Sequence, residues 1–401
     1  MLTPFKTADF NNQFGRTLGK ISWRAASLGE CETAAGRIED GNLDSWLAVW
    51  RELADGLAKT ADACLAAGHR SSAADCYLRA SEYYRQATFF HRVDLDNPDL
   101  QKGWPRVQAC FIAGTRAAGM AVEPVQIPFE GKYFSGYLFR AETTDTSAPL
   151  VIAPSGYDGT AEESAIMVAM PALRRGYHAL TFDGPGQGPT LYDPARRLFM
   201  RPDWENVLPA VVDFAVAQPG IDAERLVACG VSFGGFLVPR GVSGEPRIAA
   251  LIADPGQYDI GAGIKAMLPA KLAALLDTDS KEADAAFQPM LADIDKQLLF
   301  LPRMAAHGCT SLRAYLQDLM RYTSAEQAGS IHCPSLICDN ETDAVSTGQG
   351  AKLAAAIGKP ATAVRFTVAQ GAAGHCEGVG REIFEQVAFD WLDATLSRTP
   401  R

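Results

Sequence analysis

The fold of this chain is best read outward from one stretch, Leu226-Val227-Ala228-Cys229-Gly230-Val231-Ser232-Phe233-Gly234-Gly235. Its first four residues are continuously apolar and predict a buried strand. The apolar run Phe236-Leu237-Val238 follows and predicts a helix. The glycines around Ser232 predict a tight strand-to-helix turn, because side chains at those positions would collide with their neighbours. Ser232 then stands at the tip of this turn as a candidate nucleophile.

Further apolar runs on both sides of this stretch predict a sheet. We expect strands at residues 125–129, 133–139, 150–153, 178–182, 225–229, 249–253, 335–338 and 363–368, the first two forming a hairpin that turns at Gly131. Apolar strands that alternate with helices indicate a mostly parallel sheet covered on both faces. The sequence therefore predicts an α/β domain over residues 122–401, with an eight-stranded sheet and a helical insertion at about residues 258–328.

Residues 1–121 carry a different pattern and are predicted to form a helical domain. Apolar residues recur at three- to four-residue spacing from Leu43 to Leu57 and from Ala73 to Phe90, with a turn at residues 68–70. A third helix is expected to follow Pro105. This helical pair does not recur at a fixed period, which argues against a solenoid.

The composition limits the function classes. Of the 401 residues, 47% are hydrophobic and 21% are charged, which suits a large core and excludes general disorder. The formal net charge of −10 argues against nucleic acid as a partner, since a polyanion requires a basic surface. The nine cysteines include no C-x-x-C pair, which argues against a zinc ribbon or a thioredoxin-like redox site. We therefore expect no metal and no cofactor.

The sequence contains no membrane-directing segment that we recognise. The N-terminal residues lack the apolar core of a signal peptide, and no run of 18 apolar residues exists. Free thiols in this number suit a reducing compartment. We therefore expect a cytoplasmic protein without a membrane partner.

A serine hydroxyl is a weak nucleophile and needs an adjacent base. Three histidines follow Ser232 in the sequence. His375 stands in a loop of small residues directly after the last predicted strand, whereas His307 falls in the insertion and His332 precedes a strand. We therefore predict that His375 is the base.

The base in turn needs a carboxylate that orients it. Asp343 lies a few residues after the strand at residues 335–338, at the sheet edge expected for His375. Asp254, after the strand at residues 249–253, is the alternative, because some hydrolases place their acid there. We predict Asp343.

An oxyanion site requires backbone N–H groups near the nucleophile. Phe233 should supply one of them, and Gly156 or Tyr157, in the loop after the strand at residues 150–153, should supply the second. The glycine-rich stretch at residues 183–188 lacks the spacing and helix start of a dinucleotide loop. We interpret it as a turn that shapes the floor of the site.

Together these motifs resemble the α/β-hydrolase family. The resemblance rests on residues 230–235, on residues 182–188 and on Gly374-His375. The helical region, with residues 79–87 and Phe89-Phe90, is similar to the subgroup that contains 2,6-dihydroxypseudooxynicotine hydrolase and fungal polyketide chain-shortening hydrolases. The resemblance implies an α/β-hydrolase fold with a helical N-terminal cap domain. One departure is the loop Pro154-Ser155-Gly156, where this group often begins with paired glycines.

The resemblance implies a serine hydrolase that cleaves a carbon–carbon bond in a β-diketone or acyl-phenol, an aromatic or polyketide-like small molecule of secondary metabolism. The serine either attacks directly or positions water. A carboxylesterase or thioesterase, and an acyltransferase or cyclase, are alternatives on the same three residues. The intact order of these residues argues against an inactive hydrolase that serves only as an interaction module.

The resemblance also matches the family triad to Ser232, Asp343 and His375, and it implies a homodimer. Candidate substrate contacts are Tyr83, Tyr84, Tyr157 and Phe233. For the tyrosines of the helical region, packing between helices is the alternative interpretation.

Overall fold

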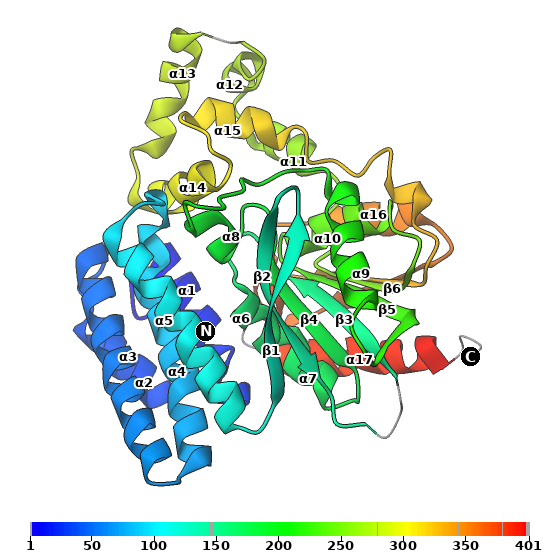
Figure 1. Ribbon diagram of the computed structural model, residues 1–401. Coiled ribbons are helices and arrows are strands. Elements are labelled where there is room, and N and C mark those ends of the chain that lie inside the picture. Colours follow the sequence, from blue (N-terminus) through cyan, green and yellow to red (C-terminus); the bar gives the residue numbers. More distant parts are fainter. Residues whose placement is uncertain (1, 144–146, 279, 344, 379, 398–401) are drawn as a thin grey trace. The chain divides into compact units, whose positions relative to one another are not determined.

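The computed structural model describes residues 2–143, 147–278, 280–343, 345–378 and 380–397. These residues include one eight-stranded sheet (Figure 1). The strands are β1 Ala121–Phe129, β2 Lys132–Arg140, β3 Ala148–Pro154, β4 His178–Asp183, β5 Ile221–Val231, β6 Ile248–Asp254, β7 Ser335–Asn340 and β8 Ala361–Phe366. Their spatial order is β1-β2-β4-β3-β5-β6-β7-β8. β2 pairs with β4 antiparallel, and the neighbours from β4 to β8 pair in parallel. The predicted mostly parallel sheet is therefore confirmed.

The burial of the central strands explains their apolar sequences. Every residue of β3 and of β4 is buried, as expected where helices cover both faces of a sheet. The β1–β2 hairpin turns at Glu130 and Gly131, whose φ angles of +47° and +75° suit a two-residue turn. Parallel register places Val231 of β5 beside Asp254 of β6. The carboxyl ends of these two strands therefore meet.

Helices cover both faces of this sheet. They are α6 Ala161–Ser164, α7 Met170–Leu173, α9 Leu208–Val216, α10 Gly234–Val242, α16 Gln349–Ile357 and α17 Arg381–Ser397, whereas the short helix α8 Gly188–Tyr192 follows β4 in the chain. α9 and α10 lie on one face, and α7 and α17 lie on the other (Figure 1). α10 packs on β5 and β6, and α17 packs on β6. The predicted insertion holds α11 Ile260–Met267, α12 Ala270–Leu275, α13 Lys281–Phe287, α14 Ile294–Ala306 and α15 Leu312–Leu319.

The chain divides into two compact units. The helical unit comprises residues 1–122, 192–195 and 287–312, and the sheet unit comprises residues 123–191, 196–286 and 313–401. Residues 287–312 thus cluster with the helical unit, whereas the sequence analysis placed the whole insertion in the second domain. The domain assignment made from sequence stays a prediction.

Aromatic side chains form the core of the helical unit, which contains α1 Ala8–Leu18, α2 Leu28–Arg37, α3 Leu43–Ala66, α4 Arg70–Thr88 and α5 Pro98–Ala117. The ring centroids of Phe10 and Trp46 lie 4.5 Å apart. The third predicted helix is confirmed as α5, but it begins at Pro98 and not after Pro105, so only the predicted start was wrong. The side chain of Asn97 caps the first N–H groups of α5, and proline is well suited to the first helical position.

Candidate active site

The turn between β5 and α10 holds Ser232 in a strained conformation. The turn consists of Ser232 and Phe233, between the last residue of β5 and the first of α10. The φ angle of Ser232 is +60°, in the left-handed region that costs a residue with a side chain about 1–3 kcal/mol. Its N–H donates to the carbonyl of Asp254 at 2.7 Å, and its carbonyl accepts from the N–H of Gly235 at 2.8 Å. These bonds hold the serine at the tip of the turn.

Close backbone contacts explain the glycines that flank this serine. A Cβ atom at Gly230 would lie 2.0 Å from the carbonyl oxygen of Gly234. A Cβ atom at Gly235 would lie 1.8 Å from the carbonyl oxygen of Pro255. Real Cβ atoms do not approach backbone so closely, so the turn can be built only with glycine at these two positions.

We expect the substitution Gly235→Ala to lower the free energy of unfolding by about 3 kcal/mol, because the added methyl group has no room beside Pro255. Gly234→Ala is the matched control, since a Cβ atom at Gly234 would meet nothing within 4 Å. That control should change the stability by no more than about 1 kcal/mol. Urea unfolding of both variants measures the difference. Equal stabilities would contradict the close approach of Gly235 and Pro255.

The loops after β7 and β8 bring a carboxylate and an imidazole to Ser232. Ser232 Oγ lies 2.8 Å from Nε2 of His375, and Nδ1 of His375 lies 2.8 Å from Oδ2 of Asp343. Both contacts are hydrogen bonds when Nδ1 carries the proton, because Nδ1–H then donates to Asp343 and Nε2 accepts from the hydroxyl. The structure thus brings together the three residues that the sequence analysis selected as nucleophile, base and acid.

Asp343 is buried, and several groups donate hydrogen bonds to its carboxylate. Oδ1 accepts from the N–H of Val345 and Oδ2 accepts from Oγ of Ser346, both at 2.8 Å. Burial acts to raise the pKa of Asp343, but the hydrogen bond and charge of His375 and the bond from Ser346 outweigh burial and lower this pKa below its usual value. Asp343 is therefore an anion at neutral pH and can stabilise an imidazolium.

Asp254, the alternative acid, has a different partner. Its carboxylate accepts a hydrogen bond from Nη1 of Arg381, and both side chains are buried. His332 is exposed before β7, and His307 belongs to the helical unit. Within the sheet unit, Asp343 rather than Asp254 is therefore the carboxylate that pairs with His375.

The predicted oxyanion residues lie around the same serine. A Cβ atom at Gly156 would be 3.5 Å from Oγ of Ser232, so the loop after β3 passes directly over the hydroxyl. Phe233 is the N-cap of α10, where backbone N–H groups lack partners within the helix. The ring centroids of Tyr157 and Phe233 are 4.6 Å apart, and Oη of Tyr157 lies 3.0 Å from Oη of Tyr315.

Asp183 and Gln187, which were not predicted as site residues, support the loop after β3 through Ser155. Oγ of Ser155 donates to Oδ1 of Asp183 at 2.8 Å, and Nε2 of Gln187 donates to the carbonyl of Ser155. Oε1 of Gln187 accepts from the N–H of Gly184 at 2.8 Å. The glycine-rich stretch at residues 183–188 therefore holds Ser155, which directly precedes Gly156. The position of this stretch after a buried strand indicated that it lies near the site, but nothing in the local sequence indicated which loop it contacts.

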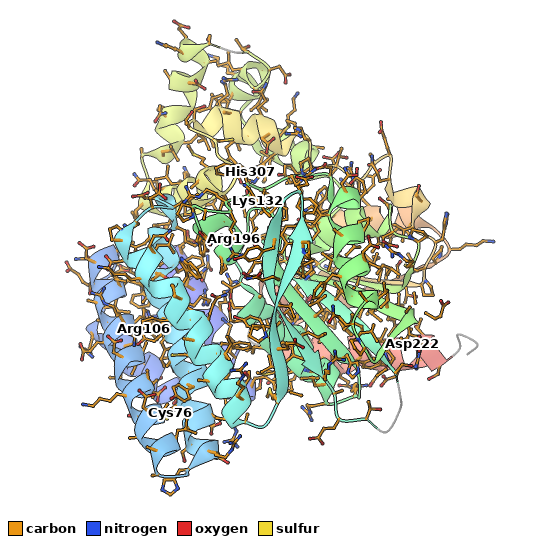
Figure 2. The ribbon with its side chains drawn as sticks, in the orientation of Figure 1. Cys76, Arg106, Lys132, Arg196, Asp222 and His307 are labelled. Atoms are coloured by element: carbon orange, nitrogen blue, oxygen red, sulfur yellow. The ribbon has the colours of Figure 1, made fainter. Side chains whose placement is uncertain are left out.

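Tyr83 and Tyr84, the candidate substrate residues of the helical unit, are both buried within that unit. Oη of Tyr83 donates to Oε2 of Glu30 at 2.8 Å. The guanidinium carbon of Arg106, labelled in Figure 2, lies 4.6 Å from the ring centroid of Tyr84. These contacts explain both rings as packing residues of the helical unit, and a contact with substrate stays a prediction.

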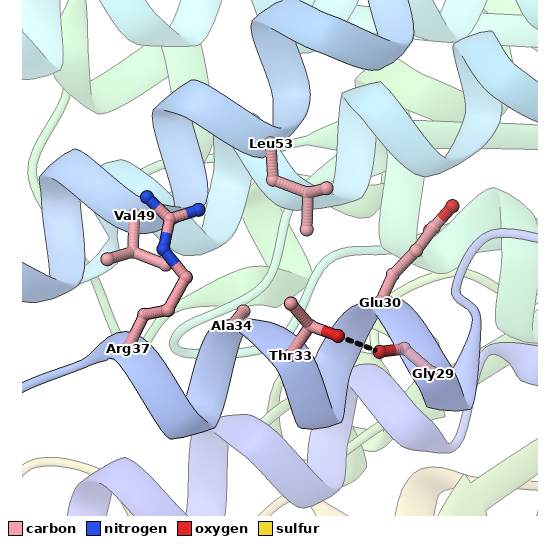
Figure 3. A pocket seen from close by; sticks show the side chains of 7 residues that line it. All are labelled: Gly29, Glu30, Thr33, Ala34, Arg37, Val49 and Leu53. Atoms are coloured by element: carbon pink, nitrogen blue, oxygen red, sulfur yellow. Dashed lines mark hydrogen bonds between the residues drawn. The ribbon is translucent and has the colours of Figure 1, made fainter.

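A groove of about 300 Å³ lies between α2 and α3 of the helical unit (Figure 3). It is lined by Gly29, Glu30, Thr33, Ala34, Arg37, Val49 and Leu53. The Thr33 hydroxyl donates to the carbonyl of Gly29 at 2.8 Å, and Arg37 donates to Glu52 at 2.7 Å. Thr33 and Arg37 therefore both have hydrogen-bond partners within the helical unit.

The part of the chain that the structure describes has neither a metal-ligand cluster nor a membrane-spanning helix. It holds no group of three or more His, Cys, Asp or Glu side chains placed to bind a metal ion. Among its helices, none combines the length and the hydropathy needed to cross a membrane. All nine cysteines are free thiols.

Comparison with known proteins adds sequence relatives. The profile of a family described as the alpha/beta hydrolase family matches residues 150–380. The 20-hydroxy-prefusarin hydrolase of Gibberella moniliformis is 34% identical over 264 residues, which cover 64% of this chain and 62% of that protein. The hydrolyase poxO of Penicillium oxalicum is 33% identical over 269 residues, with coverage of 64% and 62%. The matched region thus spans less than two thirds of either relative.

Solved structures share the fold. The crystal structure of 2,6-dihydroxy-pseudo-oxynicotine hydrolase is similar with a TM-score of 0.72 and 22% identity, over 93% of this chain and 94% of that one. The structure of AbyA5 is similar with a TM-score of 0.66 and 16% identity, over 98% of this chain and all of that one. At these identities the likeness shows a common fold.

Proposed function

Because this chain belongs to the alpha/beta hydrolase family, we propose that it is a serine hydrolase in which Ser232 is the nucleophile, His375 the general base and Asp343 the carboxylate that orients the base. The observation that carries this proposal is the pair of 2.8 Å contacts that joins Ser232, His375 and Asp343. Activation of a serine hydroxyl requires such a hydrogen-bonded base and a group that orients the base.

Acylation begins when Nε2 of His375 takes the proton from Ser232 as Oγ bonds to a substrate carbonyl carbon. The electron pair of the carbonyl moves to its oxygen, and the N–H groups of Phe233 and of Gly156 or Tyr157 stabilise that charge. When the carbonyl re-forms, the bond to the leaving group breaks, and His375 protonates the leaving group. Water then attacks the acyl-enzyme with His375 as base, releasing a carboxylic acid and restoring Ser232.

We propose a β-diketone or an acyl-phenol as substrate, cleaved at a carbon–carbon bond. The electron pair of that bond leaves on a carbon whose charge spreads onto the adjacent carbonyl or phenol ring, so protonation by His375 is sufficient. Aromatic rings next to Ser232 support a flat substrate, since the ring centroid of Phe233 lies 4.6 Å from that of Tyr157 and 5.6 Å from that of Tyr322. The name of the 20-hydroxy-prefusarin hydrolase supports a small-molecule substrate. The helical cap, the homodimer and the cytoplasmic location stay predictions.

We expect a fluorophosphonate probe to label the wild-type protein at Ser232, because the probe reacts with a serine whose hydroxyl is activated by a base. Mass spectrometry of the digested protein locates the label. Ser232→Ala is the control and should not be labelled. Labelling at a different serine, or none at all, would contradict the nucleophile.

Product analysis tests the class of bond. In water that carries a heavy oxygen isotope, the enzyme should split a β-diketone into a ketone without the isotope and a carboxylic acid with one heavy oxygen atom. We expect a higher kcat/KM for this substrate than for an aryl ester of similar size. A clear preference for the ester would instead indicate a carboxylesterase.

A further inference from the structure

A cluster of buried charged side chains lies at the base of the candidate active site. It joins Asp254 at the end of β6, Glu377 two residues after His375, and Arg381 at the start of α17. Nη1 of Arg381 donates to Oδ2 of Asp254 and, at 3.2 Å, to Oε2 of Glu377. The three side chains are at most 4% exposed. Neither carboxyl group of this cluster has a part in the chemistry proposed above.

The cluster contacts each loop that carries a member of the proposed triad. The carbonyl of Asp254 accepts from the N–H of Ser232 at 2.7 Å. Nδ2 of Asn340, at the end of β7, donates to Oε1 of Glu377 at 3.0 Å. Oδ1 of Asn340 accepts from the N–H of Thr342, next to Asp343, at 2.9 Å. Glu377 therefore links the loop of His375 to the loop of Asp343.

The backbone after His375 needs such support. Cys376 and Glu377 have φ angles of +53° and +51°, in the left-handed region. Residues with side chains cost about 1–3 kcal/mol each in sparsely populated conformations and persist there only when their surroundings hold them. Here Sγ of Cys376 lies 3.6 Å from the carbonyl of Asp254, and Arg381 bonds to both Glu377 and the carbonyl of Cys376.

The charges of the cluster balance only if one carboxyl group keeps a proton. Two carboxylates would face one guanidinium at a site where all three side chains are buried, and uncompensated buried charge is unfavourable. Burial, and next the charge of Asp254, raise the pKa of Glu377 to about 9, whereas Arg381 and Asn340 act to lower it. The groups that face Glu377 are Asp254 from β6, Asn340 and Cys338 from β7, Cys376 from its own loop and Arg381 from α17.

We propose that Glu377, in its neutral form, is a positioning residue that holds the His375 loop in register with Ser232 and Asp343. Its carboxylic acid donates to Asp254 and accepts from Asn340, so one side chain joins the three loops. Ionisation would place two anions side by side and displace the loop. This inference rests on the proposed function, because it assigns a role in positioning the proposed base.

The test compares Glu377→Gln, Glu377→Ala and the control Glu382→Gln, an exposed position on α17. We expect Glu377→Gln to keep most of kcat near neutral pH, because the amide can still donate to Asp254 and accept from Asn340, although its NH2 group cannot accept the 3.2 Å bond that Arg381 donates to Oε2 of Glu377. Wild-type kcat should fall as the pH rises through about 9, and kcat of Glu377→Gln should not. Glu377→Ala should lose between about 10-fold and 10²-fold in kcat at an unchanged KM, as expected for a displaced catalytic group.

Thermal melting gives a second measurement with a defined sign. Between an ordinary glutamate pKa of about 4.3 and the folded value of about 9, the folded state keeps a proton that the unfolded chain releases. Wild-type stability should therefore fall as the pH rises across this window, and more steeply than that of Glu377→Gln.

Three outcomes would overturn the inference. The first is a fall of kcat above about pH 9 that wild type and Glu377→Gln share. The others are full kcat in Glu377→Ala and a Glu377→Gln protein that does not fold. Failure of the proposed function looks different, since the wild-type protein would then show no hydrolysis that depends on Ser232.

Discussion

Replacing Ser232 with alanine should lower kcat by about 10⁶-fold, the loss seen when a serine nucleophile is removed from an assembled triad. The hydroxyl oxygen that lies 2.8 Å from Nε2 of His375 is then absent, and no acyl-enzyme can form. Residual turnover would come from the oxyanion N–H groups and from substrate binding. The measurement is the single-turnover rate with a β-diketone, compared with the rate in buffer.

The fold should survive this substitution. Alanine keeps the Cβ atom that serine already carries at the φ angle of +60°, and the backbone bonds of the turn do not involve the hydroxyl. The melting temperature should therefore stay close to that of the wild type. His375→Ala should cost about as much as Ser232→Ala, and the double variant should lose little more, because the two residues act as a unit. A fully active Ser232→Ala protein would defeat the covalent mechanism.

Replacing Asp343 with asparagine should lower kcat by about 10⁴-fold. An asparagine amide that donates to Nδ1 of His375 favours the tautomer with its proton on Nε2, and that nitrogen can no longer accept the Ser232 proton. Glu341→Gln is the control, because Glu341 is exposed on the same loop. Steady-state kinetics of both variants measure the effect. Comparable losses in the two would contradict a specific role for Asp343.

Asp343→Asn should also change how the stability of the folded protein depends on pH in the acid range. The pKa of Asp343 in the folded protein lies below its usual value, so its contribution is present above the unfolded pKa of about 3.9 and is lost as the pH falls through the folded pKa. The variant lacks this contribution. Melting temperatures measured below about pH 4 should therefore fall less steeply with pH in the variant than in the wild type.

Much of the sheet could be predicted because its signals are local. A strand such as β3, buried at every position, must be continuously apolar, and that pattern is visible in any window of the sequence. The turn at Ser232 is equally local, since Gly230 and Gly235 are needed within a few residues of it. The start of α5 was misplaced because the apolar period after Pro105 outweighed the capping signal of Asn97 and Pro98.

Other features could not be predicted because they depend on contacts between distant segments. Periodicity predicts that residues 294–306 are helical, but it does not say with which helices they cluster. The hydrogen bond from Gln187 to Ser155 joins two loops that both follow buried strands, and the sequence of neither loop indicates that it contacts the other. The division of the insertion and the support of the loop after β3 were therefore visible only in three dimensions.

The linear sequence determined the order of the strands along the chain and the tight turn at Ser232, because steric clashes and side-chain periodicity act between near neighbours. It also limited the candidate base and acid to a few histidines and aspartates. Folding decided which carboxylate is hydrogen-bonded to His375. Arg381, 127 residues beyond Asp254, bonds to that aspartate and leaves Asp343 to face the imidazole. Electrostatic pairing depends on distance in space, and only the packed sheet brings these charges within reach of one another.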